Sequence, residues 1–291
     1  MGSGARRSTF LLIMPELPEV ETIRRQLQSR IVGKTIKKVQ VLYPKLVRDL
    51  SGADFIARLK GKRIGDVLRQ GKLILIRLNG KETLVMHLKM TGRLLLTQSA
   101  SFVKSPSSHL EAIFTFSDGS QMFYADLRRF GYMKILPTQD EAVLVEKESL
   151  GIDFFDERLT LPEFTRLIRS RGKSQIKPLL MDQTLISGIG NIYAQEACFA
   201  AKIYPLRKAE TLRDAEIEDL YNALHEILNK AIQKRGSSSD AYVDAFGQQG
   251  EFVPYLKIYG REGKPCPRCK TKLQKKNIGG RGTVFCAKCQ K

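Results

Sequence analysis

The stretch Met14-Pro15-Glu16-Leu17-Pro18-Glu19-Val20-Glu21 holds two prolines and three glutamates at the start of an apolar repeat. Prolines and acidic residues suit the first turn of a helix, where amide donors are free and the helix dipole is positive. The helical spacing continues through residue 31, and Gly33 is a natural end for the helix. Glu21 can pair with Arg25 four residues later. The stretch is therefore either a capped helix start or a site of chemistry, and the rest of the chain must decide.

After Gly33 the apolar period changes from helical to two, which predicts strands. The turn Asp118-Gly119 joins two of these strands into a hairpin. Short connections favour an antiparallel sandwich, and the polar residues 97–108 favour a loop. The predicted strands are 35–42, 63–68, 72–78, 83–88, 111–116, 121–125 and 131–136.

Beyond Pro137 a charged connector leads to a helical region. Helices are predicted over 161–170, 173–181, 192–201 and 211–234, the last with an apolar stripe typical of a core-facing helix. The polar residues 236–252 form a long segment that is either functional or disordered. We therefore expect an α+β multidomain fold: an extension at 1–14, a β-sandwich with an N-terminal helix at 15–137, a linker at 138–160, a helical domain at 161–262 and a terminal domain at 263–291.

The net charge of +19 over 291 residues indicates a polyanionic partner, nucleic acid first and an anionic membrane surface second. The alternative to a polyanionic partner is that the basic residues only keep the protein soluble. No apolar run approaches the ~20 residues of a membrane helix, so we expect no membrane partner. Residues 1–14 look foreign to the rest: an organellar transit peptide is one reading, and an extension or mis-assigned translation start is the reading we favour.

Four of the five cysteines form two CxxC pairs near the C-terminus. Cys266, Cys269, Cys286 and Cys289 have the spacing of a tetrahedral four-thiolate zinc site with no open coordination position, so one structural Zn²⁺ is expected. Residues 278–280 look like a hairpin tip that presents Arg281. No acidic residue follows Gly263, which favours DNA contact over a clip that only stabilises the tail. The lone Cys198 is expected to belong to a core.

Two further motifs lie between the start and the cysteines. Gly188-Ile189-Gly190-Asn191 follows a predicted helix and opens the next, and amides at a helix start bind phosphate. Asn191 could cap that helix or bind a phosphate itself. The loop Asp126-Leu127-Arg128-Arg129-Phe130-Gly131 places arginines beside an aromatic residue, which suits either a salt-bridged loop over a core or a wedge in a DNA duplex. Met90 follows another strand and fits a core or the same wedge.

Taken together, residues 15–21, 126–131 and 188–193 and the terminal cysteines resemble the formamidopyrimidine glycosylase and endonuclease VIII family, in the same order along the chain. The resemblance covers about Pro15 to the end. It implies a β-sandwich domain, a helix-two-turn-helix domain and a zinc-finger β-hairpin, with damaged double-stranded DNA between the lobes. Leu127 departs from the proline that many relatives carry, which should affect the stiffness of the loop.

The resemblance also implies the catalytic residues. Pro15 matches the N-terminal proline whose amine attacks the sugar, and Glu16 matches the acid that protonates the sugar ring oxygen. Lys72 matches a lysine that contacts phosphate beside the lesion and assists elimination. The alternative is that Lys72 is only a lysine at the start of a strand. Arg281 matches the zinc-hairpin arginine that grips the phosphates of the lesion and is linked to the final elimination. A terminal amine titrates close enough to neutrality to act as a nucleophile.

The remaining implied residues contact DNA. His109, Arg128 and Lys173 match DNA-contact positions, and Asn191 matches the phosphate-binding asparagine of the glycine turn. Met90, Arg128 and Phe130 match the residues that fill the space left by the everted base, and 236–252 matches the lesion-recognition loop. The implied protein is a bacterial, cytoplasmic, monomeric glycosylase and AP lyase for oxidised purines in base-excision repair. Two alternatives stay open: an endonuclease VIII-like enzyme for oxidised pyrimidines, and a non-catalytic zinc-containing DNA-binding protein if the extension keeps Pro15 an amide.

Overall fold

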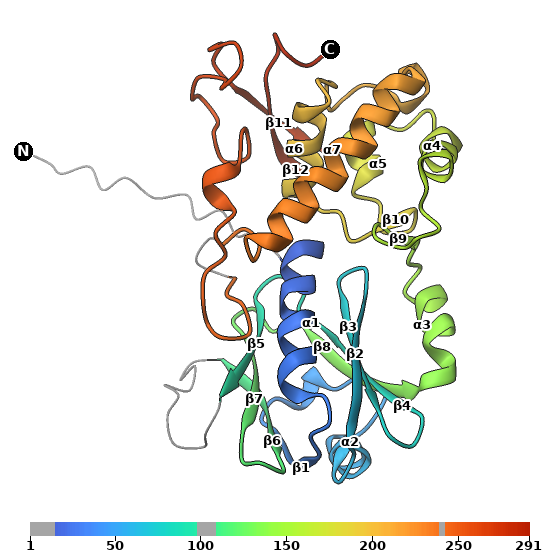
Figure 1. Ribbon diagram of the computed structural model, residues 1–291, viewed down its shortest axis with the longest axis vertical. Coiled ribbons are helices and arrows are strands. Elements are labelled where there is room, and N and C mark those ends of the chain that lie inside the picture. The colour runs from blue at the N-terminus through green and yellow to red at the C-terminus, as the bar shows by residue number, and fades with distance from the viewer. Residues whose placement is uncertain (1–14, 98–108, 239–241) are drawn as a thin grey trace, which may run out of the picture.

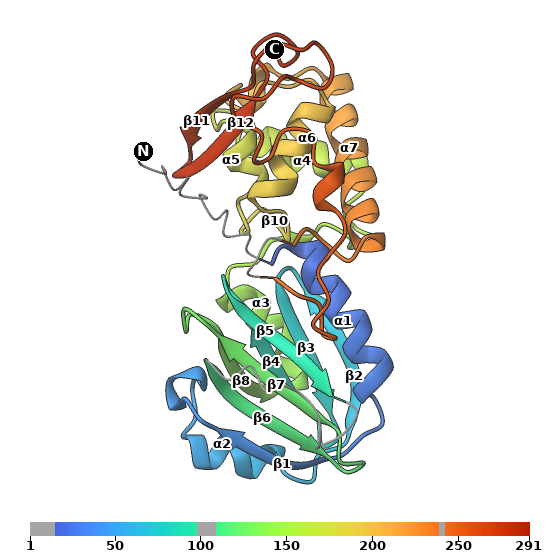
Figure 2. The ribbon, with the colours of Figure 1, turned by 90° about the vertical axis from the view of Figure 1, so that its left-hand side faces the viewer.

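The computed structural model describes residues 15–97, 109–238 and 242–291. The expectations for residues 1–14, most of the loop 97–108 and the tip of 236–252 lie outside the described residues. The described chain forms two lobes, a β-sandwich and a helical lobe that carries a β-hairpin (Figure 1). A side view shows the lobes stacked end to end, with the helix α1 reaching from one toward the other (Figure 2).

The lower lobe consists of two four-stranded antiparallel sheets, as the alternating pattern predicts. Their orders are β1-β6-β7-β5 and β2-β3-β4-β8. Strand β5 and the short helix α2 were not predicted. The elements are β1 (Ile36–Val41), α2 (Gly52–Leu59), β2 (Ile64–Gln70), β3 (Leu73–Leu78), β4 (Glu82–His87), β5 (Gly92–Thr97), β6 (Leu110–Phe116), β7 (Gln121–Asp126) and β8 (Tyr132–Pro137).

Helix α1 (Leu17–Ile31) belongs to both lobes. Its first residue, Leu17, is buried in the core of the helical lobe, whereas Val20, Ile23 and Leu27 are buried in the core of the sandwich. The predicted ion pair of Glu21 with Arg25 is confirmed, with a distance of 2.7 Å between Oε1 and Nε. The start of α1 is therefore fixed at the junction between the lobes, where a rigid site can be built.

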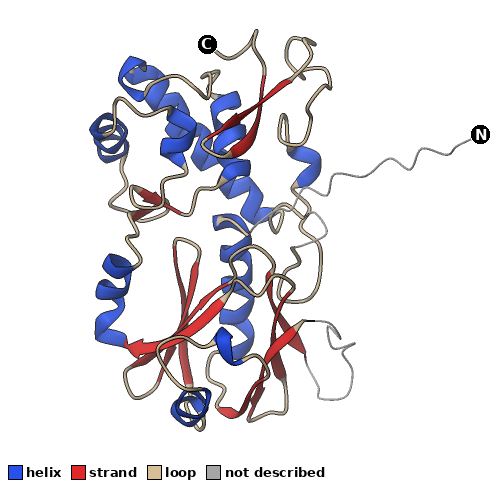
Figure 3. Cartoon of the chain, turned by 180° about the vertical axis from the view of Figure 1, so that it is seen from behind, coloured by secondary structure: helices blue, strands red, loops and turns tan. Residues whose placement is uncertain are grey.

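The upper lobe is mainly helical, as a view coloured by secondary structure shows (Figure 3). The charged connector contains a helix that was not predicted. The helix predicted over 173–181 is only one turn long and begins at Ile176, because Pro178 lacks an amide hydrogen and is tolerated only in the first turn of a helix. The elements are α3 (Glu141–Lys147), β9 (Ile152–Asp153), α4 (Leu161–Ser170), α5 (Ile176–Leu180), β10 (Ile186–Ser187), α6 (Asn191–Ala200), α7 (Asp214–Gln233), β11 (Gln274–Ile278) and β12 (Arg281–Phe285).

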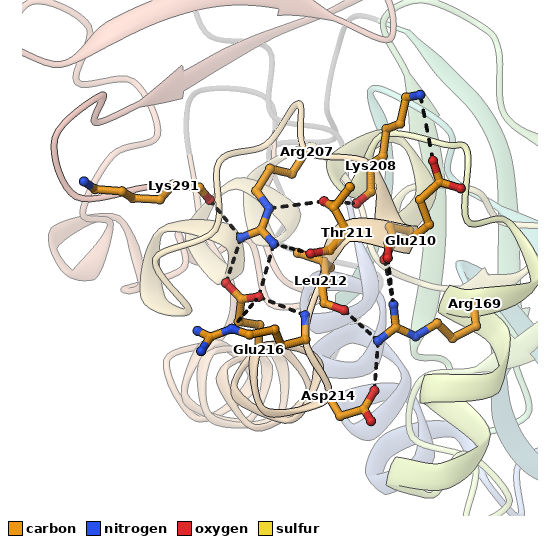
Figure 4. A network of polar contacts seen from close by, with 11 residues as sticks. Arg169, Arg207, Lys208, Glu210, Thr211, Leu212, Asp214, Glu216 and Lys291 are labelled. Carbon is orange, nitrogen blue, oxygen red and sulfur yellow. Dashed lines mark hydrogen bonds and ion pairs between the residues drawn. The ribbon is translucent and has the colours of Figure 1, made fainter.

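A polar network fixes the connection that leads into α7 (Figure 4). Arg207 forms two hydrogen bonds with Glu216 on the first turns of α7, at 2.7 and 3.1 Å, and donates to the backbone carbonyl of Lys291 at 3.2 Å. Arg169 on α4 donates to the carbonyl of Leu212 at 2.6 Å. The last residue of the chain is thereby attached to the helical lobe.

The segment that follows α7 returns to the sandwich. Tyr242 and Ala245 are buried in the sandwich core, and Leu96 at the edge of β5 donates to the carbonyl of Ala245 at 2.8 Å. Gln26 of α1 donates to the carboxylate of Asp244 and accepts from the amide of Ala245, at 2.9 and 2.8 Å. The described part of 236–252 therefore bridges both lobes. None of the described helices combines the length and apolarity needed to cross a bilayer.

Candidate active site at the junction of the lobes

Glu16 directly precedes α1, and its carboxylate reaches into the other lobe. Its two oxygens accept hydrogen bonds from the amides of Ile192 and Tyr193 at 3.0 and 3.5 Å, on the first turn of α6. Only glycine fits at residue 190, because a Cβ there would lie 2.2 Å from the Glu16 carboxyl carbon. Burial raises the pKa of Glu16, and the nearby ammonium of Lys72 and the backbone amides oppose that rise. The amides of Ile192 and Tyr193, at the helix start suggested above for a phosphate, hold this carboxylate instead.

A second buried glutamate, Glu19, is hydrogen-bonded to the backbone of Glu16. Glu19 accepts hydrogen bonds from the Tyr193 hydroxyl at 2.6 Å, from the Ser237 amide at 2.7 Å and from the Glu16 amide at 3.0 Å. Burial, together with the adjacent Glu16 carboxylate, raises the pKa of Glu19 to about 7. Glu19 therefore links α1, α6 and the segment after α7, a role that its place in the sequence motif did not indicate.

Lys72 lies at the tip of the β2–β3 hairpin, which touches the glycine turn before α6. Its Nζ donates to the carbonyl of Ile189 at 3.3 Å. Burial lowers the pKa of Lys72; the carboxylates of Glu16 and Glu19 oppose this, and the charge of Arg281 adds to it. The charges of Glu16 and Arg281 therefore both act on Lys72, although the three residues come from different elements.

A buried clamp holds the Lys72 hairpin against the helical lobe. Arg69 on β2 makes a bidentate ion pair with Asp153 on β9, with 2.9 Å between Nη2 and Oδ1, and a 3.1 Å contact with Glu21. Asp153 also accepts from the amide of Gly71 at 2.7 Å. Paired charges that are buried and hydrogen-bonded are costly to break. The clamp thus fixes the position of Lys72.

Lys177 is a site residue that sequence reasoning did not single out. Its fully buried side chain donates to Oδ1 of Asn191 at 2.7 Å, and burial lowers its pKa to about 8. Asn191 is the first residue of α6, and its side chain binds Lys177 rather than capping the helix. The predicted contact residue Lys173 is exposed, one turn before α5. The signal for Lys177 was its place in the helix predicted over 173–181, the helix that precedes the glycine motif at 188–191.

Arg281 begins β12 directly after the turn at Gly279 and Gly280, as predicted for a hairpin tip. The Arg281 side chain is exposed and has no hydrogen-bond partner within the described residues. Its charge nevertheless lowers the pKa of both Lys72 and Lys177. Arg281 is therefore a free cation at the edge of the same site.

The loop after β7 gathers the three predicted wedge residues. Asp126 is fully buried and accepts from the hydroxyl of Thr91. The amides of three loop residues also donate to it, at 2.8–3.1 Å. Arg128 then lies 4.6 Å from the ring centroid of Phe130 and donates to Sδ of Met90 at 3.0 Å. Half of Phe130 stays exposed. Met90, Arg128 and Phe130 thus form one rigid, partly apolar cluster, and the core reading of Phe130 is wrong.

Two residues at the start of β6 lie near this loop. His109, a predicted DNA contact, is exposed and has a positive φ of 76°. Glu111 is fully buried, and neither of its oxygens has a hydrogen-bond partner among the described residues; the nearest cation is Nε of Arg129 at 3.7 Å. Burial and the carboxylate of Asp126 raise the pKa of Glu111 to about 7, with Arg129 opposing.

The pKa of Glu111 predicts a pH-dependent effect of Glu111→Gln on stability. Between pH 4.5 and 7 the folded protein holds a proton on Glu111 that the unfolded chain has lost, so stability falls as pH rises. The glutamine variant removes that loss. We expect the gain in free energy of unfolding, measured with urea, to be about 1–3 kcal/mol larger at pH 8 than at pH 5.5. An equal gain at both pH values would contradict the assignment.

The four terminal cysteines converge on one point. Their Sγ atoms all lie within 4.8 Å of one another, and Cys266 and Cys286 are buried in a small core of their own. Four thiolates at this spacing suit tetrahedral Zn²⁺ and leave no position for a substrate. The predicted ligand set is brought together, and its metal would be structural.

Comparison with known proteins agrees with this arrangement along the whole described chain. Family models described as the formamidopyrimidine-DNA glycosylase N-terminal domain and H2TH domain match residues 14–133 and 150–242, and one described as a zinc finger found in FPG and IleRS matches 263–291. A formamidopyrimidine-DNA glycosylase of Pelotomaculum thermopropionicum is 43% identical over 96% of this chain and 99% of its own. One from Heliobacterium modesticaldum is 41% identical over 96% of this chain and 100% of its own.

Solved structures of similar proteins contain DNA. A complex of Lactococcus lactis Fpg with abasic-site DNA has a TM-score of 0.87 and 34% identity, and covers 95% of this chain and 100% of its own. A complex of a variant of that protein with Fapy-dG-containing DNA has a TM-score of 0.85 and 35% identity, and covers 95% of this chain and 99% of its own.

Proposed function

The chain belongs to the formamidopyrimidine-DNA glycosylase family, and from this membership we propose that it is a bifunctional glycosylase and AP lyase for oxidised purines, 8-oxoguanine and formamidopyrimidines above all. The observation that carries the proposal is the placement of Glu16. Its buried carboxyl group follows Pro15 directly and shares its surroundings with Lys72. An acid, a candidate nucleophile and a cation thus lie side by side.

Pro15 is the proposed nucleophile. In a chain that begins at Pro15, its secondary amine bonds to C1′ of the damaged nucleotide while the glycosidic bond breaks, and the base leaves with a proton. Glu16 donates a proton to O4′ as the C1′–O4′ bond opens, leaving an iminium ion between C1′ and the proline nitrogen. The raised pKa of Glu16 favours the protonated form that this step needs.

Elimination then cuts the strand. The iminium acidifies the C2′ proton, and its removal breaks the C3′–O bond and releases the phosphate on the 3′ side (β-elimination). Loss of a C4′ proton breaks the C5′–O bond in the same way (δ-elimination), and water releases Pro15. Lys72 and Arg281 stabilise the phosphate groups that leave, because both cations border the same site.

Damaged double-stranded DNA is the proposed partner. Met90, Arg128 and Phe130 fill the space of the everted base, since an exposed aromatic ring beside a guanidinium suits a wedge between bases. His109 and Lys173 remain proposed DNA contacts and Asn191 a proposed phosphate contact, with Lys177 added through its bond to Asn191. We further propose that the protein acts as a monomer in the bacterial cytoplasm, with one zinc ion, and that the domain bounds given above hold.

The substrate is tested with duplexes that carry one lesion each. For a chain beginning at Pro15 we expect 8-oxoguanine to be excised and nicked faster than thymine glycol. A similar Fpg from Lactococcus lactis was crystallised with DNA containing an oxidised pyrimidine, so the comparison must be one of rates. Faster cleavage of thymine glycol would favour the endonuclease VIII-like alternative.

Removal of zinc should weaken DNA binding before it affects the sandwich. The cysteines share a small core with Phe199, Ile258, Leu273 and Val284 that is separate from the sandwich core. Metal loss should therefore unfold the hairpin alone and release Arg281. We expect a chelator to reduce affinity for abasic-site DNA at least about tenfold, with recovery on added Zn²⁺. Unchanged affinity in metal-free protein would restore the reading of a clip that only stabilises the tail.

A further inference from the structure

Helix α6 is hydrogen-bonded to the outer edge of β12, the strand that begins with Arg281. In the β11–β12 hairpin, Gly282 pairs with Asn277 and Val284 with Lys275, both non-hydrogen-bonded positions, so their free backbone groups point away from β11. Gln195 fills both of them: its Nε2 donates to the carbonyl of Gly282 at 3.2 Å, and its Oε1 accepts from the amide of Val284 at 2.7 Å. The side-chain amide of Gln195 thus makes the hydrogen bonds with β12 that a neighbouring strand would make.

The same glutamine is tied back to the start of α6. Its Nε2 also donates to the carbonyl of Asn191 at 2.9 Å, and only 1% of the residue is exposed. The amide of the next residue, Ile192, holds the carboxylate of Glu16. Within five residues, α6 therefore contacts both Glu16 and the strand that carries Arg281.

The side chain of Arg281 has no hydrogen-bond partner among the described residues, so it does not hold the hairpin tip in place. Its place is set by its backbone, and Gly282 is its immediate neighbour. The other contact of the tip is with α5, where a Cβ on Gly279 would lie 3.2 Å from the ring of Pro178. Contact with a proline ring resists approach but makes no directional bond. The directional bonds between the tip and the helical lobe come from the two bonds of Gln195 and from a longer one, in which Nδ2 of Asn191 donates to the carbonyl of Gly282 at 3.5 Å.

We propose that Gln195 is a positioning residue that sets Arg281 relative to Glu16 and Lys72 for the last elimination. The inference rests on the proposed function for the role of Arg281. In this proposal Gln195 fixes the position of the hairpin tip, and a different residue fixes the end of the hairpin near the zinc ligands.

Gln290 holds that other end and supplies a matched control. It is also a buried glutamine with two backbone partners: its Oε1 accepts from the amide of Cys286 at 2.8 Å, and its Nε2 donates to the carbonyl of Ile203 at 2.9 Å. Gln195→Leu and Gln290→Leu therefore remove the same kind of bonds from the same hairpin, one near Arg281 and one near the zinc ligands.

The test uses duplexes with a preformed abasic site and a chain that begins at Pro15. We expect Gln195→Leu to lower the ratio of δ- to β-elimination products about tenfold, because the buried amide of Val284 loses its partner and the carbonyl of Gly282 keeps only the 3.5 Å bond from Asn191. Borohydride trapping and zinc content should stay near wild type. Gln195→Glu keeps the acceptor for Val284 and loses the donor to Gly282, so its ratio should be intermediate. Gln290→Leu, measured in zinc-loaded protein, should leave the ratio unchanged.

A double-mutant cycle shows whether Gln195 acts through Arg281. In an Arg281→Gln background, Gln195→Leu should cause almost no further change in the product ratio. Additive effects, or a wild-type ratio in zinc-loaded Gln195→Leu, would overturn the inference. So would a loss of trapping that matches the loss of δ product.

Failure of the proposed function would look different. Wild-type protein would then give no trapped complex, whatever residue stands at 195. The salt dependence of DNA binding still reports on Gln195 in that case: if Arg281 meets a phosphate, Gln195→Leu and Arg281→Gln should each reduce the slope of log Kobs against log salt by about one. A full wild-type slope for Gln195→Leu beside a reduced one for Arg281→Gln would overturn the positioning role.

Discussion

Glu16→Gln should reduce excision of 8-oxoguanine by about 10²- to 10⁴-fold, the range typical for loss of a general acid. A glutamine fits the same space, and its single oxygen can still accept from the amide of Ile192, although its NH2 group cannot accept from the amide of Tyr193. What it lacks is the proton that the opening sugar needs at O4′. The carboxyl group of Glu16 is suited to hold that proton because burial raises its pKa.

The same variant should still act on a preformed abasic site. An abasic sugar opens to an aldehyde in water, so the proline amine can reach C1′ without ring protonation by Glu16. We therefore expect borohydride to trap Glu16→Gln on abasic DNA but not on 8-oxoguanine DNA. Glu82→Gln is the matched control, since Glu82 pairs with Arg58 and Lys62 away from the site. Normal excision by Glu16→Gln would remove Glu16 from its role.

Much of the fold could be predicted because its signals are local. The apolar stripe of α1, the period of two in β2–β4 and the Asp118-Gly119 turn each lie within a few residues. Helix α2 has only eight residues, too short for a clear apolar stripe, although Ser51 caps it by accepting from the amide of Asp54 at 3.1 Å. Strand β5 follows a tight turn and ends at the polar loop, so its alternation was hidden.

The candidate site was only partly predictable, because its bonds join residues far apart in the chain. The motif residues themselves were identified by resemblance, but their partners were not. Nothing local shows that the carboxylate of Glu16 meets the amide of Ile192, 176 residues later, or that Glu19 meets Ser237 across 218 residues. Lys177 and Gln195 face the site only because α5 and α6 pack as they do. Spacing predicts ligands that lie close in sequence, such as the cysteines, and not such long-range pairs.

The state of the Pro15 nitrogen should decide whether the protein forms a covalent complex at all. A chain that begins at Pro15 carries a secondary amine, and terminal amines titrate near pH 8, so a useful fraction is neutral at pH 7–8. A chain that begins at Met14 differs by one residue and carries an amide, whose lone pair is delocalised. We expect borohydride trapping on abasic DNA to fall by at least about 10³-fold in the Met14 form.

The Met14 form also separates chemistry from binding. Arg128, Phe130 and Arg281 are unchanged in it, so it should retain affinity for a tetrahydrofuran site, which cannot form an iminium ion. Intact mass must show which residue begins each chain, because removal of Met14 by a peptidase would restore the amine. If the Met14 form, verified by mass, were trapped as fast as the Pro15 form, another amine would be the nucleophile. Lys72 would then be the first to test, because its lowered pKa and its place beside Glu16 suit an attacking amine.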